Sequence, residues 1–369
     1  MCTRSKFLSL ALLGACGLLA QSTRLDPHST LHITLPEDAP VTVLSADWGE
    51  SSASPRGGAM LLDLHTSLSL RNSQGRRIRG ITLLVTAQEV TPGGKASVSV
   101  PSLNIGPGEA FPIRIDLRLL RPLQLGNGPL VQVGLDGVLF DDLSFYGPNK
   151  LNCRRSMTVW ELEARRDRKH FKSVLEASGG EALRTEMLAS LERQAARAGM
   201  DARVARAGRG TNTVSERQIQ FAFLQTPDSP VRTENGMMRV AADEARSPRL
   251  SFTNKSDKTV RALEIGWMIK DSRGKEYVAG SIPVELDLAP QQKTMVIQDV
   301  AFKFSEPNGQ AIHIEGMTGF VSSVEYTDGR MWIPSRASKL PTPSPEEQRL
   351  AELYRKRGLN AVVEELRKF

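Results

Sequence analysis

The sequence repeats itself at one constant spacing, and this repeat constrains the fold more than any other feature. Leu68-Ser69-Leu70-Arg71-Asn72 recurs as Leu250-Ser251-Phe252-Thr253-Asn254, an offset of 250 − 68 = 182 residues. Ile78-Arg79-Gly80-Ile81 recurs at that offset as Val260-Arg261-Ala262-Leu263, and Gly134, Gly137 and Gly147 fall on Gly316, Gly319 and Gly329. Unrelated segments would not keep one register over this length. We therefore expect a tandem duplication, with units near 31–160 and 215–336.

Both units have the residue pattern of β-strands. Apolar residues alternate at Leu68 and Leu70 and again at Leu263, Ile265, Trp267 and Ile269, which indicates strands with one buried face. Turn-forming clusters separate the strands, at 72–75, 92–94, 271–274 and 327–329. Short strands without intervening helices favour two antiparallel β-sandwich domains, so the predicted fold class is mainly β.

One passage occurs in both units and carries a family resemblance. An asparagine, a short polar turn and then Ile/Val-Arg-x-Ile/Leu run from Asn72 to Ile81 and from Asn254 to Leu263. This passage resembles the strand B to strand C passage of immunoglobulin-like and fibronectin type III domains. Trp267 stands where such folds often place a core tryptophan, although the first unit has no matching Trp and neither unit has paired core cysteines. The resemblance implies tandem binding or spacer domains and brings no catalytic residues with it.

The segment between the units has helical periodicity. Apolar residues fall three or four apart from about 160 to 177 and from 181 to 199, with an interruption at Gly179-Gly180. These positions predict a helical and flexible connector over 161–214 that follows a first domain at 21–160. Residues 150–210 hold 14 basic and 8 acidic side chains, 14 − 8 = +6, so much of the positive charge lies here. The stretch from Arg203 to Thr213 has little apolar content, and we expect it to be a mobile loop.

The second domain, 215–336, precedes a proline-rich spacer at 337–345 and a helix at 346–369. Ser344 is the expected N-cap, Pro345 suits the first turn, and Glu346-Glu347 complement the helix dipole. An apolar stripe follows the helix and continues beyond Gly358: Leu350, Leu353, Tyr354, Leu359, Val362, Val363 and Leu366. Short helices are marginal alone, so the second sandwich or a separate protein must cover this stripe. The stripe is therefore a candidate partner-docking surface.

The N-terminus has the features of a secretory signal peptide over 1–20. Arg4 and Lys6 precede an uncharged apolar run that is shorter than a membrane-spanning helix. Leu13-Gly14-Ala15-Cys16 resembles the bacterial lipoprotein box, which would place a lipid on Cys16, whereas Ala20-Gln21 offers an ordinary cleavage point. Either route predicts export to the periplasm, the outer membrane or the exterior, with membrane attachment only through the lipid.

Motifs of the common enzyme classes are absent from the sequence. There is no glycine-rich phosphate loop, Gly-x-Ser-x-Gly, His-Glu-x-x-His or Cys-x-x-Cys. Cys153, the one cysteine outside the leader, is expected to be an isolated thiol. His28 and His32 lack a third ligand nearby, and neighbouring Asp141 and Asp142 would point to opposite faces of a strand. We therefore predict no catalytic, cofactor-binding or metal-binding residue and no cofactor, and we interpret the Asn254-Lys255-Ser256 glycosylation sequon as a turn.

These features predict an exported, non-catalytic interaction or scaffolding protein whose partner is another envelope protein. The net charge of +7 includes Arg4 and Lys6 of the leader, and the remaining 7 − 2 = +5 is too dispersed for nucleic-acid binding. Two alternatives stay open. One is an extracytoplasmic enzyme with an unrecognised site. The other is a polyanion- or carbohydrate-binding module, although an aromatic content of 5% provides few stacking residues. The oligomeric state is not predicted.

Overall fold

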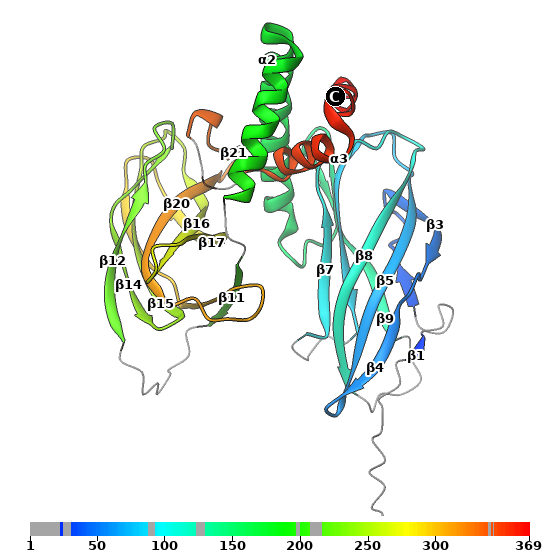
Figure 1. The fold of residues 1–369 in the computed structure, drawn as a ribbon, viewed down its shortest axis with the longest axis horizontal. Helices are drawn as coiled ribbons and strands as arrows, with labels where there is room; N and C mark the ends of the chain where they lie inside the picture. Colours follow the sequence, from blue (N-terminus) through cyan, green and yellow to red (C-terminus); the bar gives the residue numbers. More distant parts are fainter. Residues whose placement is uncertain are drawn as a thin grey trace, which may run out of the picture. The chain divides into compact units, whose positions relative to one another are not determined.

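The computed structural model describes residues 23–24, 31–87, 93–122, 130–196, 200–206, 216–338, 341 and 343–369. These residues form two strand-rich regions and two long helical elements (Figure 1). The predicted mainly β class and the helical tail are confirmed. Close contacts divide the chain into two compact units. One holds the segments up to residue 75, 82–99 and 107–136, and the other holds 76–81, 100–106 and 137–369.

The first strand-rich region contains two five-stranded sheets. One has the order β1-β4-β5-β3, with β8 also paired to β5. Its strands are β1 (Thr23–Arg24), β3 (Val41–Asp47), β4 (Ser52–Arg56), β5 (Ala59–Asn72) and β8 (Ala110–Pro122). The other has the order β10-β9-β6-β7, with β2 parallel to β9. Its strands are β2 (Leu31–Thr34), β6 (Ile78–Thr86), β7 (Lys95–Val100), β9 (Val131–Phe140) and β10 (Phe145–Tyr146).

The second strand-rich region forms one eleven-stranded sheet. Its main path runs β11-β19-β15-β14-β12-β20-β16-β17, while β13 and β18 pair with β15, and β21 pairs with β20. The strands are β11 (Asp201–Arg206), β12 (Arg217–Leu224), β13 (Val231–Thr233), β14 (Gly236–Ala241), β15 (Glu244–Asn254), β16 (Val260–Asp271), β17 (Glu276–Leu288), β18 (Lys293–Ile297), β19 (Val300–Ser305), β20 (Ile314–Tyr326) and β21 (Met331–Trp332).

Trp267 lies in the core of this second region. The Trp267 ring centroid is 5.0 Å from that of Phe221 and 6.1 Å from that of Phe302. The predicted buried face of β16 is confirmed, because its four predicted members are each at most 1% exposed: Leu263, Ile265, Trp267 and Ile269. Burial of a continuous apolar row supplies most of the free energy that holds such a strand in its sheet.

Positions related by the sequence repeat make the same backbone contacts. The amide of Asn72 donates to the carbonyl oxygen of Glu109, and the amide of Asn254 donates to that of Gln292. Each asparagine side chain also accepts a hydrogen bond from the backbone amide of the second residue after it, and this bond closes the turn in both regions. The predicted turn role of Asn254 is confirmed. Strand pairing follows the same register, because β8 lies against β5 as β18 lies against β15.

The helical element α2 (Cys153–Ala195) is a hairpin rather than one straight helix. Gly179 breaks it with φ 78° and ψ −175°, at the predicted interruption. His170 Nε2 lies 3.7 Å from a carboxylate oxygen of Glu186. In a straight helix these residues would be about 24 Å apart along the axis. The two halves therefore fold back on each other.

The tail element α3 (Pro345–Arg367) repeats this geometry. Gly358 has φ 77° and ψ −177°, and Arg349 lies 2.7 Å from Glu365 across the turn. The predicted N-cap is confirmed, since the Ser344 hydroxyl accepts the amide of Glu347. The short 3-10 helix η1 (Arg336–Ser338) precedes the tail.

Two predicted boundaries need correction. The helical connector starts at Cys153, before residue 161. The expected mobile loop is wrong at its beginning, because residues 203–206 belong to β11, which pairs antiparallel with β19. All six side chains of β11 are exposed, so its backbone hydrogen bonds hold it, and hydrophobic patterning does not reveal it. The rest of that loop, His28, and the signal peptide with Cys16 lie outside the described residues.

Candidate functional site

The predicted docking stripe of α3 packs against α2 of the same chain. Leu350, Val362 and Leu366 are at most 1% exposed and share one apolar cluster with α2 residues Phe171, Leu183 and Met187. The remaining stripe residues are partly buried against that cluster: Leu353, Tyr354, Leu359 and Val363. The cover is therefore α2, which replaces both covers expected from the sequence. Partner docking on this stripe would require α3 to leave α2.

Buried charges fix the start of α3 onto α2. Ser344, the N-cap of α3, donates its hydroxyl to Asp167 of α2, whose side chain is fully buried. Arg336 lies 3.0 Å from Asp167 and 2.9 Å from Glu347. Arg193 lies 2.7 Å from the other oxygen of Glu347. Because each buried carboxylate has at least two charged or hydroxyl partners, removal of one partner should be costly.

These partners keep both carboxylates ionised. Burial by itself would raise the pKa of Asp167, but hydrogen bonding and charge from Arg166, the Ser344 hydroxyl and the charge of Arg336 together lower it below its ordinary value. Burial likewise acts to raise the pKa of Glu347, and the charge of Arg336 with hydrogen bonds from α2 outweighs it. The ion pairs and hydrogen bonds at this junction therefore hold the start of α3 against α2.

Glu163, which also lies on α2, differs from Asp167 and Glu347 because its pKa is raised and not lowered. Burial raises its pKa from 4.5 to about 7; the charge of Arg166 opposes this, and the charges of Asp167 and Glu264 add to it. Such a carboxyl changes its charge near neutral pH.

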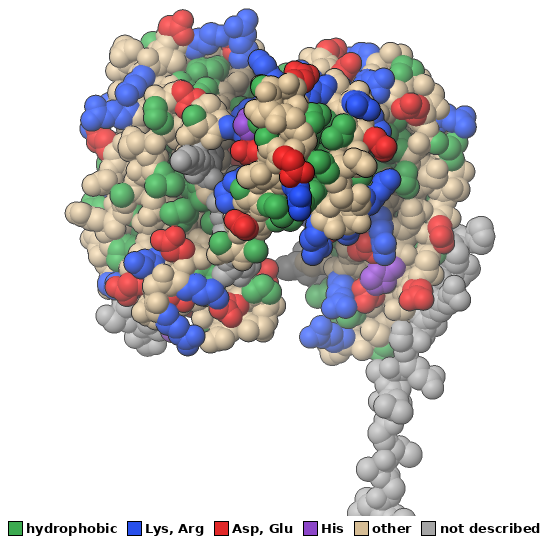
Figure 2. All heavy atoms as spheres, turned by 45° about the horizontal axis from the view of Figure 1, so that its top comes forward, with side chains coloured by type: hydrophobic (Ala, Val, Ile, Leu, Met, Phe, Trp, Pro, Cys, Tyr) green, Lys and Arg blue, Asp and Glu red, His purple; other side chains and the backbone are tan. Residues whose placement is uncertain are grey.

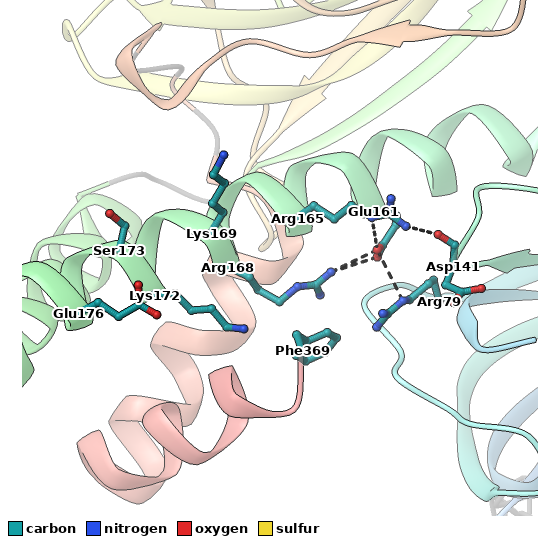
Figure 3. A pocket seen from close by; sticks show the side chains of 10 residues that line it. All are labelled: Arg79, Asp141, Glu161, Arg165, Arg168, Lys169, Lys172, Ser173, Glu176 and Phe369. Carbon is teal, nitrogen blue, oxygen red and sulfur yellow. Dashed lines mark hydrogen bonds and ion pairs between the residues drawn. The ribbon is translucent and has the colours of Figure 1, made fainter.

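A cleft of about 670 Å³ lies beside the first half of α2. Basic side chains dominate its lining, as Figure 3 shows: Arg79, Arg165, Arg168, Lys169 and Lys172. The ring of Phe369 lies against two of them, with its centroid 3.9 Å from the Arg168 guanidinium carbon and 5.1 Å from that of Arg79.

One buried carboxylate forms ion pairs with three of these cations. Glu161 lies 2.8 Å from Arg165, 3.2 Å from Arg168 and 3.7 Å from Arg79. The cleft is lined by five basic and only three acidic residues, the latter being Asp141, Glu161 and Glu176. Positive charge is therefore in excess in the cleft.

The second candidate surface is the edge strand β18. Within the described residues, β18 pairs only with β15, so its other backbone edge is unpaired. Met295 and Ile297 point away from the core and are 66% and 55% exposed, the two highest values among the large apolar residues that the structure describes. A strand edge that is both unpaired and apolar can pair with a strand of another chain.

The first strand-rich region protects the matching edge. Pro112 of β8 lies opposite Ser69, as Met295 lies opposite Ser251 of the repeat, so Pro112 and Arg114 occupy the positions of Met295 and Ile297. Proline has no amide hydrogen to donate, and a charged side chain resists apolar contact. Only the second region therefore presents an apolar edge at this place in the repeat.

The other residues singled out in the sequence have structural surroundings. Cys153 is buried against Leu139 and Met157. The carboxylate of Asp142 accepts the amide and hydroxyl of Ser144, so the two aspartates lie in the turn after β9 and not on a strand as expected. His32 is exposed on β2.

Within the described ranges, no three His, Cys, Asp or Glu side chains converge as metal ligands would. None of the helices in those ranges has an apolar stretch long enough to cross a membrane. On the face that Figure 2 shows, the described Lys and Arg side chains are interspersed with Asp and Glu side chains.

Sequence reasoning missed both surfaces, although each had a signal. Arg165, Lys169 and Lys172 are spaced to share one helical face, but the contribution of Arg79 comes from a strand distant in sequence. Met295 and Ile297 become visible when this part of the repeat is aligned at an offset of 295 − 112 = 183, one residue more than elsewhere, and compared with Pro112 and Arg114.

No family model matches the chain, and no curated protein matches it. Among solved structures it is similar to a β-glucosidase from Kluyveromyces marxianus, with 11% identity and a TM-score of 0.15 over 74% of this chain and 44% of that one. A red sea bream transglutaminase gives 10% identity and a TM-score of 0.13, over 77% of this chain and 31% of that one. The C-terminal globular domain of an oligosaccharyltransferase from Pyrococcus abyssi gives 9% identity and a TM-score of 0.15, over 80% of this chain and 48% of that one. The chain thus spans less than half of each, and TM-scores this low carry no information about function.

Proposed function

We propose that this protein is an exported, non-catalytic binding protein of the cell envelope, built from two related immunoglobulin-like sandwiches, and that β18 is its contact strand. The observation that carries this proposal is the exposed pair Met295 and Ile297 on an unpaired strand. The leader-like sequence at 1–20 supports export, and the repeated registers support two related domains.

The geometry favours an extended apolar segment as the partner element. Side chains of β18 alternate, so Met295 and Ile297 share the solvent face while Val296 points inward. A strand added along the free edge would use main-chain hydrogen bonds for affinity and this apolar pair for selectivity. The chain already shows such an addition, because β11 pairs along β19, the next strand after β18.

Charge substitution at this face tests the proposal. The mature protein and the Met295→Lys/Ile297→Lys variant are used to recover partners from envelope extract, and the recovered proteins are quantified by mass spectrometry. We expect an envelope protein that is enriched by the native chain and recovered roughly tenfold less by the variant, since the variant loses buried apolar area.

The matched control is Val43→Lys/Leu44→Lys, which changes an exposed apolar pair on β3. We expect this control to recover the partner as the native chain does. Equal recovery by the β18 variant, or loss with the β3 control alone, would place the contact elsewhere and refute the role of β18.

A further inference from the structure

The cleft beside α2 holds two basic groups that the surrounding structure leaves incompletely satisfied. The Nε of Arg79 is buried, makes no hydrogen bond among the described residues, and faces a carboxylate oxygen of Glu161 at 3.7 Å, beyond hydrogen-bond distance. Lys172 is half-buried, and no carboxylate in the described part of the chain lies within ion-pairing distance of it. Buried donors are normally satisfied, so an unsatisfied one indicates a missing partner.

These two groups lie on either side of one aromatic ring. Figure 3 shows Lys172 reaching from α2 toward one side of Phe369, and Arg79 approaching the other side from β6. Arg168 stacks on the same ring. An anion that enters the cleft beside this ring would therefore meet an ammonium group and guanidinium groups together.

Crowding of like charges adds a driving force for an anion. Burial lowers the pKa of Arg79, Glu161 opposes this, and the nearby charges of Arg168, Arg77 and Arg165 lower it further. Glu161 is shared among three guanidinium groups, of which Arg168 also contacts Glu346 at 3.4 Å, so like charges remain crowded in the cleft. A bound anion would relieve that repulsion.

We propose that this cleft binds a phosphate-bearing anion between Lys172 and Arg79. Phosphate suits the site because guanidinium groups bind it through paired N–H donors and lysine binds it as a point charge. A volume of about 670 Å³ is within the range of small-molecule sites, so the ligand is larger than a single phosphate. A soluble polyphosphorylated molecule and a phospholipid headgroup share this chemistry.

Titration calorimetry with sodium tripolyphosphate, and flotation with phosphatidylglycerol vesicles, test the site and separate the two sources. Lys172→Gln should weaken binding roughly tenfold, while Lys172→Arg, which keeps the charge, should retain it. Lys356→Gln removes one exposed lysine outside the cleft and should bind as the native chain does. The melting temperature of each variant confirms that it is folded.

Lysine-dependent binding of tripolyphosphate supports a soluble ligand, and lysine-dependent binding of vesicles alone supports a headgroup. Absence of binding to both probes, or binding that Lys172→Gln and Lys356→Gln weaken equally, would overturn the proposal. Failure here leaves the role of β18 untouched, because the two surfaces share no residue.

Discussion

Single residues in α2 and α3 show how burial and charge together fix the tail. Asp167 and Glu347 are buried, and their arginine and hydroxyl partners keep them ionised. The sequence alone predicted Glu346 and Glu347 as simple partners of the helix dipole. It could not show that Asp167, far away in the chain, shares Arg336 with Glu347, because that pairing exists only after α3 packs on α2.

Glu163 should make stability depend on pH near neutrality. Its pKa is about 7 when folded and 4.5 ordinarily, so between these values the folded chain holds a proton that the unfolded chain has lost. The free energy of unfolding should therefore fall as pH rises through this window, by up to about 1.4 kcal/mol per pH unit. In urea unfolding at several pH values, Glu163→Gln should gain stability relative to the native chain from pH 5 to pH 8.

Glu192→Gln, which removes an exposed carboxylate from the same helical element, controls for the loss of one charge. A difference between Glu163→Gln and the native chain that stays constant with pH would contradict the raised pKa of the half-buried Glu163 carboxyl.

At the scale of elements, the sequence predicted those features that depend only on neighbouring residues in the chain. Alternation identified the buried face of β16, and Gly179 marked the break in α2. β11 escaped prediction because its side chains are all exposed and only pairing with β19 holds it. The cover of the α3 stripe escaped prediction for a related reason, since two hairpins that are distant in sequence meet only in the folded chain.

Replacement of Gly358 tests the hairpin geometry of α3. Its φ of 77° with ψ of −177° lies in a backbone region that is nearly restricted to glycine. Gly358→Ala should therefore lower the free energy of unfolding by about 1–3 kcal/mol, measured by urea denaturation. Asn360→Ala, at an exposed position of the same element, should have little effect or a slightly stabilising one. If both variants were equally stable, the turn at Gly358 would be assigned wrongly.

At the scale of the whole molecule, the two strand-rich regions agree in strand pairing and differ at one sheet edge, and this difference supports the proposed role of β18. The two strand-rich regions share pairing registers, yet Pro112 and Arg114 protect an edge in one region where Met295 and Ile297 expose it in the other. Sequence alternation predicts that such residues lie on one strand face. It does not predict which strands lie at an edge, because that depends on pairing across the whole sheet.

Site-specific photo-cross-linking in living cells tests the role of β18 most directly. A photoreactive amino acid is placed at position 295, and separately at position 114, the charged position that matches Ile297 in the repeat. We expect a discrete adduct with another envelope protein from position 295 and none from position 114. No adduct from position 295, or the same adduct from both positions, would contradict the role of β18.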